Sequence, residues 1–215
     1  MDLNRQLADP RRTEAFDLRP TRRLLVTFGS LRVDGGPMMW NFVRATSGMT
    51  DARVFLRDHR MAWYQRGTRE HPSVTALTAF LADVSARYAE VLFAGSSMGG
   101  YAALQYGRAV GVDVYVVNPQ TSLRIERAQD YPDPRQHLSL DALLADLPAD
   151  AVIDLATTTQ ARGTSTIVYA AQSPIDVAHA ENMAGRATLI PRDCDHHLLV
   201  KQLTASGEIA AVLRG

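Results

Sequence analysis

The chain has 215 residues, which is enough for one domain with a well-buried core. Hydrophobic residues make up 46% of the sequence and charged residues 21%, as is ordinary for a soluble globular protein. The 23 basic and 23 acidic side chains cancel to a formal net charge of zero, which argues against general nucleic-acid binding, where a strong basic excess is expected.

Apolar runs typical of buried strands alternate with helix-like segments along the chain. The polar, arginine-rich residues 1–23 are expected to form a solvated arm or an edge segment, and residues 24–215 the folded domain. The predicted strands are 24–28, 52–58, 90–95, 112–119, 165–171 and 187–193. The predicted helices are 73–89, 99–111, 139–147, 150–163 and 197–214, the last as one helix or as two separated at Gly207.

This alternation predicts the fold class. Strands rich in Val, Ile and Leu between amphipathic helices indicate βαβ units, and hence an α/β fold with a mainly parallel central sheet covered by helices on both faces. In such a sheet, ligands bind beyond the carboxyl ends of the strands. Functional residues are therefore expected where the predicted strands end.

The turn after the third predicted strand carries the strongest functional signal. Its sequence, Gly95-Ser96-Ser97-Met98-Gly99, is a G-x-S-x-G motif between a strand and a helix, the pattern of a nucleophile elbow. The bend strains the central residue, and side chains two positions before or after it would collide. Ser97 is thus the predicted nucleophile and the amide of Met98 a predicted oxyanion donor. Ser96 is less favoured, because the glycines do not flank it symmetrically.

Two other glycine-rich motifs fit this turn poorly. A phosphate-binding P-loop needs a Lys-Ser/Thr pair after its glycines, whereas Tyr101 and Ala102 follow Gly100. A dinucleotide fingerprint has a different glycine spacing and an acidic residue after the next strand, where this chain has Asn118-Pro119-Gln120.

A serine hydroxyl needs a base, which is usually histidine. In this kind of fold the chain order is serine, acid, histidine, with the acid and the histidine after the last two strands. Those positions hold Asp176 and the pair His196-His197. We favour His197, because it directly precedes the apolar run 198–200 at the start of the last helix, and His196 remains an alternative.

Other titratable residues near the C-terminus are assigned less specific roles. Asp193 and Asp195 are alternative acids, but they fit turn formers or a helix cap better. A metal site within residues 193–197 is not expected, because the segment lacks the i, i+4 or C-x-x-C spacing of metal sites. His179 is expected on a helix surface, and the remaining histidines in solvent: His59, His71 and His137.

The loop after the first strand of the domain is expected to complete the site. We assign the second oxyanion amide to Ser30, with a plain β-turn as the alternative. Several large apolar side chains lie near strand exits and either line an apolar acyl pocket or belong to the core: Met38, Met39, Trp40, Trp63 and Tyr64.

Three features bear on the compartment. Cys194 is the only cysteine, so neither an intrachain disulfide nor a cysteine-based metal cluster can form. The first five residues lack the apolar core of a secretory signal, and no apolar run approaches the ~20 residues of a membrane helix. We expect a cytoplasmic protein without a membrane partner.

At these residues the sequence resembles the α/β-hydrolase superfamily, over about residues 24–214. More narrowly, "FAGSSMGGYAALQYG", the following "VVNPQTSL" and the closing "HLLVKQL" resemble small hydrolase-like proteins of bacterial biosynthetic pathways. No "HG" dipeptide precedes the oxyanion loop and no large lid insertion is visible, although residues 122–163 could form a small helical cap. Both departures leave the substrate class open.

The resemblance implies a serine hydrolase with a Ser–His–Asp triad and no cofactor. Its substrate would be a small molecule or acyl compound with an ester, thioester or amide carbonyl, cleaved through an acyl-enzyme. An acyltransferase of a biosynthetic pathway and a non-catalytic binding protein with the same fold are the alternatives.

Overall fold

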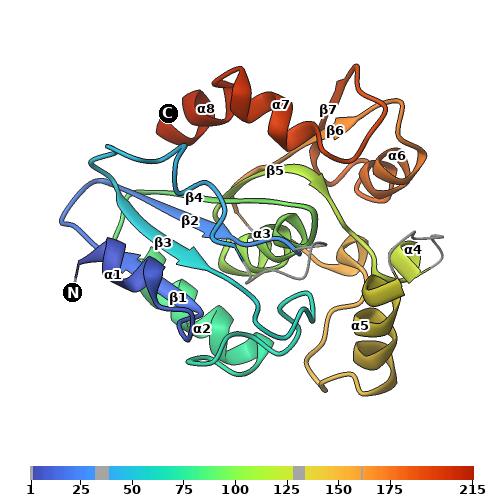
Figure 1. The fold of residues 1–215 in the computed structure, drawn as a ribbon, viewed down its shortest axis with the longest axis horizontal. Coiled ribbons are helices and arrows are strands. Elements are labelled where there is room, and N and C mark those ends of the chain that lie inside the picture. Colours follow the sequence, from blue (N-terminus) through green and yellow to red (C-terminus); the bar gives the residue numbers. More distant parts are fainter. Residues whose placement is uncertain (1, 32–38, 128–133, 161) are drawn as a thin grey trace.

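A twisted sheet forms the centre of the molecule (Figure 1). The computed structural model describes residues 2–31, 39–127, 134–160 and 162–215. Within them, seven strands lie in the order β1-β3-β2-β4-β5-β6-β7. The strands are β1 (Glu14–Asp17), β2 (Arg23–Phe28), β3 (Ala52–Leu56), β4 (Glu90–Ser96), β5 (Asp113–Pro119), β6 (Ser165–Ala170) and β7 (Thr188–Arg192). All neighbours pair in parallel except β1 and β3, so the predicted mainly parallel α/β sheet is confirmed.

Helices cover both faces of this sheet, as predicted. They are α1 (Leu3–Ala8), α2 (Val74–Ser85), α3 (Ser97–Val110), α4 (Leu123–Arg127), α5 (Pro134–Ala145), α6 (Pro174–Glu181), α7 (Leu199–Ala205) and α8 (Glu208–Arg214). On one face, buried leucine and isoleucine side chains of α7 and α8 pack against Ala94 and Val117. Helices α2 and α3 lie on the other face (Figure 1). Their buried side chains form the larger apolar core with Phe28 and Phe93.

The six predicted strands all form, with ends within two residues of the predicted ones. The apolar runs of β2, β3, β4 and β5 are largely buried, which is why period and composition were sufficient to find them. The edge strand β7 has no fully buried residue. The predicted C-terminal helix is divided into α7 and α8 at Gly207, whose φ of +80° is in the left-handed region that favours glycine.

The helix predicted over residues 150–163 is wrong. The chain forms only a short 3-10 helix there, η1 (Leu155–Thr157). Leu155 N donates to Thr121 O at 2.9 Å, which ties the segment to the chain that leaves β5. Hydrogen bonds to a distant part of the chain therefore override the local helix propensity.

The arginine-rich N-terminal segment contains α1 and the edge strand β1. Glu14 lies opposite Leu56 in the antiparallel pairing with β3. Gln6 of α1 is buried and binds the backbone of Phe16 on both sides, with Nε2 donating to its carbonyl and Oε1 accepting from its amide. In the part of the chain that the structure describes, no helix has both the length and the apolar character to cross a bilayer.

Candidate active site

Ser97 occupies a strained corner between β4 and α3. Its φ of +52° is in the left-handed region, which is unfavourable for a residue with a Cβ atom. A Cβ on Gly95 would lie 2.1 Å from the carbonyl oxygen of Gly99, and a Cβ on Gly99 would lie 2.2 Å from the carbonyl oxygen of Phe28. Both positions therefore require glycine, as the motif predicts.

A hydrogen-bonded chain of three side chains leads away from this corner. Ser97 Oγ lies 2.9 Å from His197 Nε2, and His197 Nδ1 lies 2.6 Å from Asp176 Oδ1. Ser97 begins α3, Asp176 lies in the first turn of α6 beyond β6, and His197 follows β7 just before α7. A neutral imidazole with its proton on Nδ1 satisfies both contacts, since it donates to the carboxylate and accepts from the hydroxyl.

The surroundings of the two titratable groups differ. The side chain of Asp176 is fully buried, whereas that of His197 is 38% exposed and so remains accessible from outside. The second carboxylate oxygen of Asp176 is buried without a hydrogen-bond partner among the described residues.

The pKa of His197 is raised above its ordinary value of 6.5. Burial alone lowers this pKa, because desolvation disfavours the imidazolium. The hydrogen bond and the charge of Asp176 raise it by more, and the charge of Glu126 adds to the effect. His197 thus holds a proton more firmly than a free histidine, which suits a group that accepts a proton from a hydroxyl.

The alternative base and acids lie elsewhere. His196 is exposed, and its Nδ1 is 3.5 Å from Cys194 Sγ rather than near Ser97. Asp193 accepts a hydrogen bond from the side-chain Nε2 of Gln172, and Asp195 is exposed. Of the predicted candidates, the structure brings His197 and Asp176 to Ser97.

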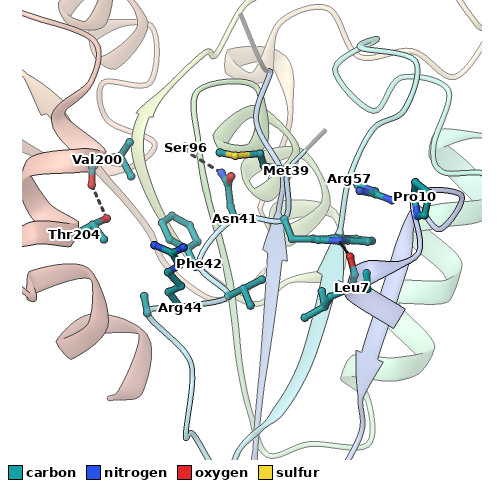
Figure 2. A pocket seen from close by; sticks show the side chains of 14 residues that line it. Leu7, Pro10, Met39, Asn41, Phe42, Arg44, Arg57, Ser96, Val200 and Thr204 are labelled. Carbon is teal, nitrogen blue, oxygen red and sulfur yellow. Dashed lines mark hydrogen bonds between the residues drawn. The ribbon is translucent and has the colours of Figure 1, made fainter. Parts of the chain in front are cut away.

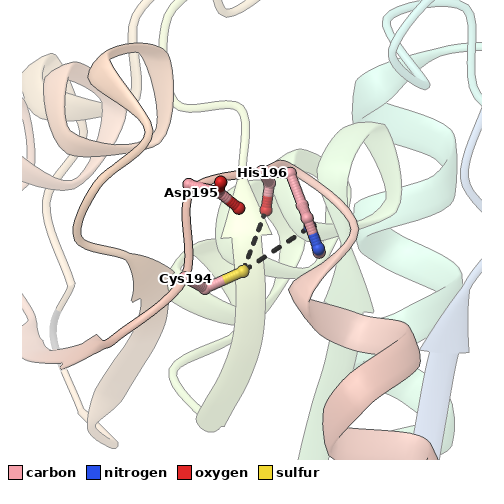
Figure 3. Close-up of side chains that lie close together, drawn as sticks. All are labelled: Cys194, Asp195 and His196. Atoms are coloured by element: carbon pink, nitrogen blue, oxygen red, sulfur yellow. Dashed lines mark hydrogen bonds between the residues drawn. The ribbon is translucent and has the colours of Figure 1, made fainter.

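Three side chains of the turn before His197 are close enough to share a metal ion (Figure 3). One donor atom each from Cys194, Asp195 and His196 lies within 4.8 Å of the others, and only Cys194 is buried. All three come from consecutive residues of one turn. The expectation that the protein holds no metal stays a prediction.

The two predicted oxyanion donors also lie near Ser97. Met98 is in the first turn of α3, where backbone N–H groups have no intrahelical acceptor. Ser30 follows β2, and its hydroxyl donates to Ser96 O at 2.7 Å and accepts from Asn41 Nδ2 at 2.7 Å. These bonds fasten the loop after β2 to the end of β4. The use of the two amides by an oxyanion stays a prediction.

Ser96 is placed differently from its neighbour. Its hydroxyl lies 3.0 Å from the Ser30 hydroxyl and 3.3 Å from Asn41 Nδ2. It makes no contact with a histidine in the described part of the chain.

Several solved structures share this architecture. The capsule O-acetyltransferase of Neisseria meningitidis serogroup A superposes with a TM-score of 0.67 at 10% identity, covering 94% of this chain and 90% of that chain. Esterase B from Lactobacillus rhamnosis gives 0.57 at 13% identity, covering 96% and 83%. The chain has an α/β-hydrolase fold.

An S-formylglutathione hydrolase from Agrobacterium tumefaciens shares this fold with a TM-score of 0.51 at 14% identity, covering 91% of this chain and 85% of that chain. At sequence identities this low, the similarities show a shared fold alone. No protein-family model and no curated protein matches the sequence.

Asn118 joins the elements of this α/β-hydrolase fold at the site, a role that the sequence did not reveal. Its φ is +41°, and its side chain donates to His197 O at 2.9 Å and accepts from Ala170 N at 2.8 Å. Two residues on, Gln120 N donates to Ser97 O at 3.2 Å. The end of β5 thus holds the backbones of both Ser97 and His197. The available signal was the Asn-Pro-Gln sequence at the end of this strand.

His179 lies in a buried polar network behind the site, and its predicted surface position is wrong. The His179 residue is 1% exposed. It lies one turn after Asp176 on the same face of α6, and this face packs inward. Its Nδ1 accepts from Thr121 N at 3.0 Å, and its Nε2 is 3.0 Å from Glu126 Oε2. Since a backbone N–H can only donate, Nδ1 carries no proton and Nε2–H donates to the carboxylate. Glu126 also accepts from the side-chain amide of Gln120.

Two of the other histidines also differ from the prediction. His71 is half-buried, lies 2.6 Å from Glu14 Oε1 and stacks on Phe80 with 4.1 Å between ring centroids. His59 is partly buried. The side chain of His137 lies outside the described part of the chain.

The large apolar residues near the strand exits separate into two groups. Trp63 and Tyr64 are 1% and 0% exposed and belong to the core. Met39 and Trp40 instead line a pocket beside the site (Figure 2). Met38 lies outside the described residues.

Proposed function

We propose that the protein is a serine hydrolase that cleaves an ester, thioester or amide through Ser97, His197 and Asp176. The observation that carries this proposal is the continuous hydrogen-bond chain from hydroxyl to imidazole to buried carboxylate, with contacts of 2.9 and 2.6 Å. The strained corner at Ser97 supports it, because such strain is concentrated at functional positions.

In the first half of the reaction, Ser97 Oγ attacks the substrate carbonyl while His197 Nε2 accepts the hydroxyl proton. Asp176 accepts a hydrogen bond from Nδ1–H, keeps the imidazole in the productive tautomer and stabilises its charged form. The amides of Met98 and Ser30 bind the oxyanion, each typically contributing ~3 kcal/mol to transition-state stabilisation. The imidazolium then protonates the leaving group, and an acyl-enzyme on Ser97 remains.

In the second half, His197 takes a proton from water, and the resulting nucleophile attacks the acyl-enzyme. Collapse of this second intermediate returns the proton to Ser97 and releases the acid. An acceptor hydroxyl or amine in place of water gives acyl transfer. The fold shared with a capsule O-acetyltransferase supports this second candidate, and product analysis with candidate acceptors separates the two.

Labelling with a fluorophosphonate probe tests the proposal. The native protein is expected to react covalently, and Ser97→Ala to fold and remain unlabelled. Ser96→Ala is the matched control, because it removes the adjacent hydroxyl. We expect this variant to be labelled, whether faster or slower than the native protein. Persistent labelling of Ser97→Ala, or labelling lost only in Ser96→Ala, would overturn the assignment of the nucleophile.

A further inference from the structure

A pocket of about 740 Å³ opens on the face of the sheet that α7 covers, and Ser96, the residue before Ser97, lines it (Figure 2). Besides Ser96, four parts of the chain line it: the end of α1 with the residues after it, the segment 39–45, Arg57 after β3, and α7. Ser96 is the only lining residue from the central strands. The volume lies within the usual range of small-molecule sites, about 300–1,000 Å³.

The lining is mostly apolar and lacks a carboxylate. Leu7, Met39, Trp40, Phe42 and Val200 supply much of it, and the lining includes neither aspartate nor glutamate. An occupant would therefore gain mainly by removing apolar surface from water.

One wall of the pocket is fixed in advance. Trp40 Nε1 donates to Leu7 O at 2.9 Å, and the guanidinium of Arg57 lies 4.3 Å from the centre of the indole. Arg57 also donates hydrogen bonds to the carbonyl oxygens of Arg12 and Asp9, so its guanidinium is bound by protein groups. The Trp40 ring is held at its edge by the hydrogen bond and at its face by the guanidinium. It therefore loses little conformational freedom when a ligand binds, which favours affinity.

The pocket lining includes close chain neighbours of two residues of the candidate active site. Ser96 directly precedes Ser97, and Val200 lies three residues after His197, so the lining begins next to both groups. Two of the exposed large apolar side chains of the described residues, Met39 (52%) and Leu198 (48%), are also next to the pocket or to His197. An apolar group attached to a carbonyl at Ser97 would enter this pocket by extending past Ser96.

We propose that this pocket binds the acyl chain of the substrate, so that the protein prefers esters or thioesters of medium-length linear fatty acids to acetyl esters. This inference rests on the proposed function, since it names the substrate class of the same site. The pocket takes the chain on the acyl side of the scissile bond.

A chain-length series tests the proposal. We would measure kcat/KM for p-nitrophenyl acetate, butyrate, hexanoate and octanoate with the native protein, and use octyl acetate to present the same chain on the alcohol side. The expected rise is about fourfold per added methylene, the value for moving one methylene from water to an apolar site. Octyl acetate should gain much less from its chain.

Two matched valine variants locate the effect. Val200→Phe places a ring at the pocket wall and should lower the octanoate-to-acetate ratio of kcat/KM at least tenfold. Val212→Phe makes the same change at a partly buried valine of α8 that does not line the pocket, and should leave the ratio unchanged. Circular dichroism checks that both variants are folded.

The outcomes separate the two proposals. A flat chain-length profile, a preference for octyl acetate, or equal loss in the two valine variants overturns the acyl-pocket proposal while Ser97-dependent hydrolysis stands. Hydrolysis of the acetate by Ser97→Ala at the native rate overturns the proposed function and this inference with it.

Discussion

Replacing Ser97 by glycine should give a more stable protein than replacing it by alanine. Ser97 has a φ of +52°, where a Cβ atom crowds the following carbonyl. Both variants lose the hydroxyl and its hydrogen bond to His197. The difference between them therefore isolates the cost of the backbone conformation at the corner.

The expected magnitude follows from two opposing terms. A left-handed conformation costs a residue with a Cβ about 1–2 kcal/mol, and glycine avoids this cost. The greater conformational freedom of glycine in the unfolded chain reduces this advantage by roughly 0.5–1 kcal/mol. The net advantage of Ser97→Gly is about 0.5–1 kcal/mol, which raises Tm by about 1–4 °C for a domain of this length.

Thermal unfolding followed by circular dichroism measures this difference. Ala79→Gly, at an exposed position within α2, is the control of opposite sign and should lose about 1 kcal/mol. If Ser97→Gly melts at the same temperature as Ser97→Ala, or lower, the corner stores no strain and the reasoning is refuted. Both variants should be inactive.

The remaining predictions concern the pH dependence of kcat/KM. Because the base must be unprotonated, kcat/KM falls as the pH drops through the pKa of His197. This fall is the acidic limb of the pH profile, and the raised pKa of His197 places it above pH 6.5 in the native protein. Asp176→Asn removes the carboxylate whose charge and hydrogen bond raise the pKa of His197, so the acidic limb should move to lower pH. The rate should fall by about 10²–10⁴. An acidic limb that does not move contradicts the assignment of Asp176 as the acid. Asn118→Asp replaces the donor to His197 O by a negative charge, so the rate should fall and the limb move to higher pH. Asn118→Gly keeps the positive φ without the charge, and a limb that rises equally in both variants would contradict the electrostatic explanation.

Local patterns in the sequence were sufficient for six of the seven strands and for the elbow, but not for the edge strand β1. A buried parallel strand is a short apolar run whatever its neighbours. Glycine at 95 is required by the backbone of Gly99 in the same turn, whereas glycine at 99 is required by the backbone of Phe28 on β2 and was found from the motif alone. The chain order of serine, acid and histidine then limited the partners to a few residues. The segment 150–163 was mispredicted because hydrogen bonds to the end of β5 outweigh its helix propensity.

The sequence by itself determined that a serine stands at a tight strand-to-helix corner, with an acid and two histidines following the last two strands. Only the tertiary structure decided that His197 rather than His196 meets Ser97 across 100 residues of chain, that Asn118 holds the backbone of that histidine, and that His179 is buried. Periodicity records whether a residue faces the core or solvent. Which side chains meet depends on how separate elements are placed beside each other, and no single segment carries that information.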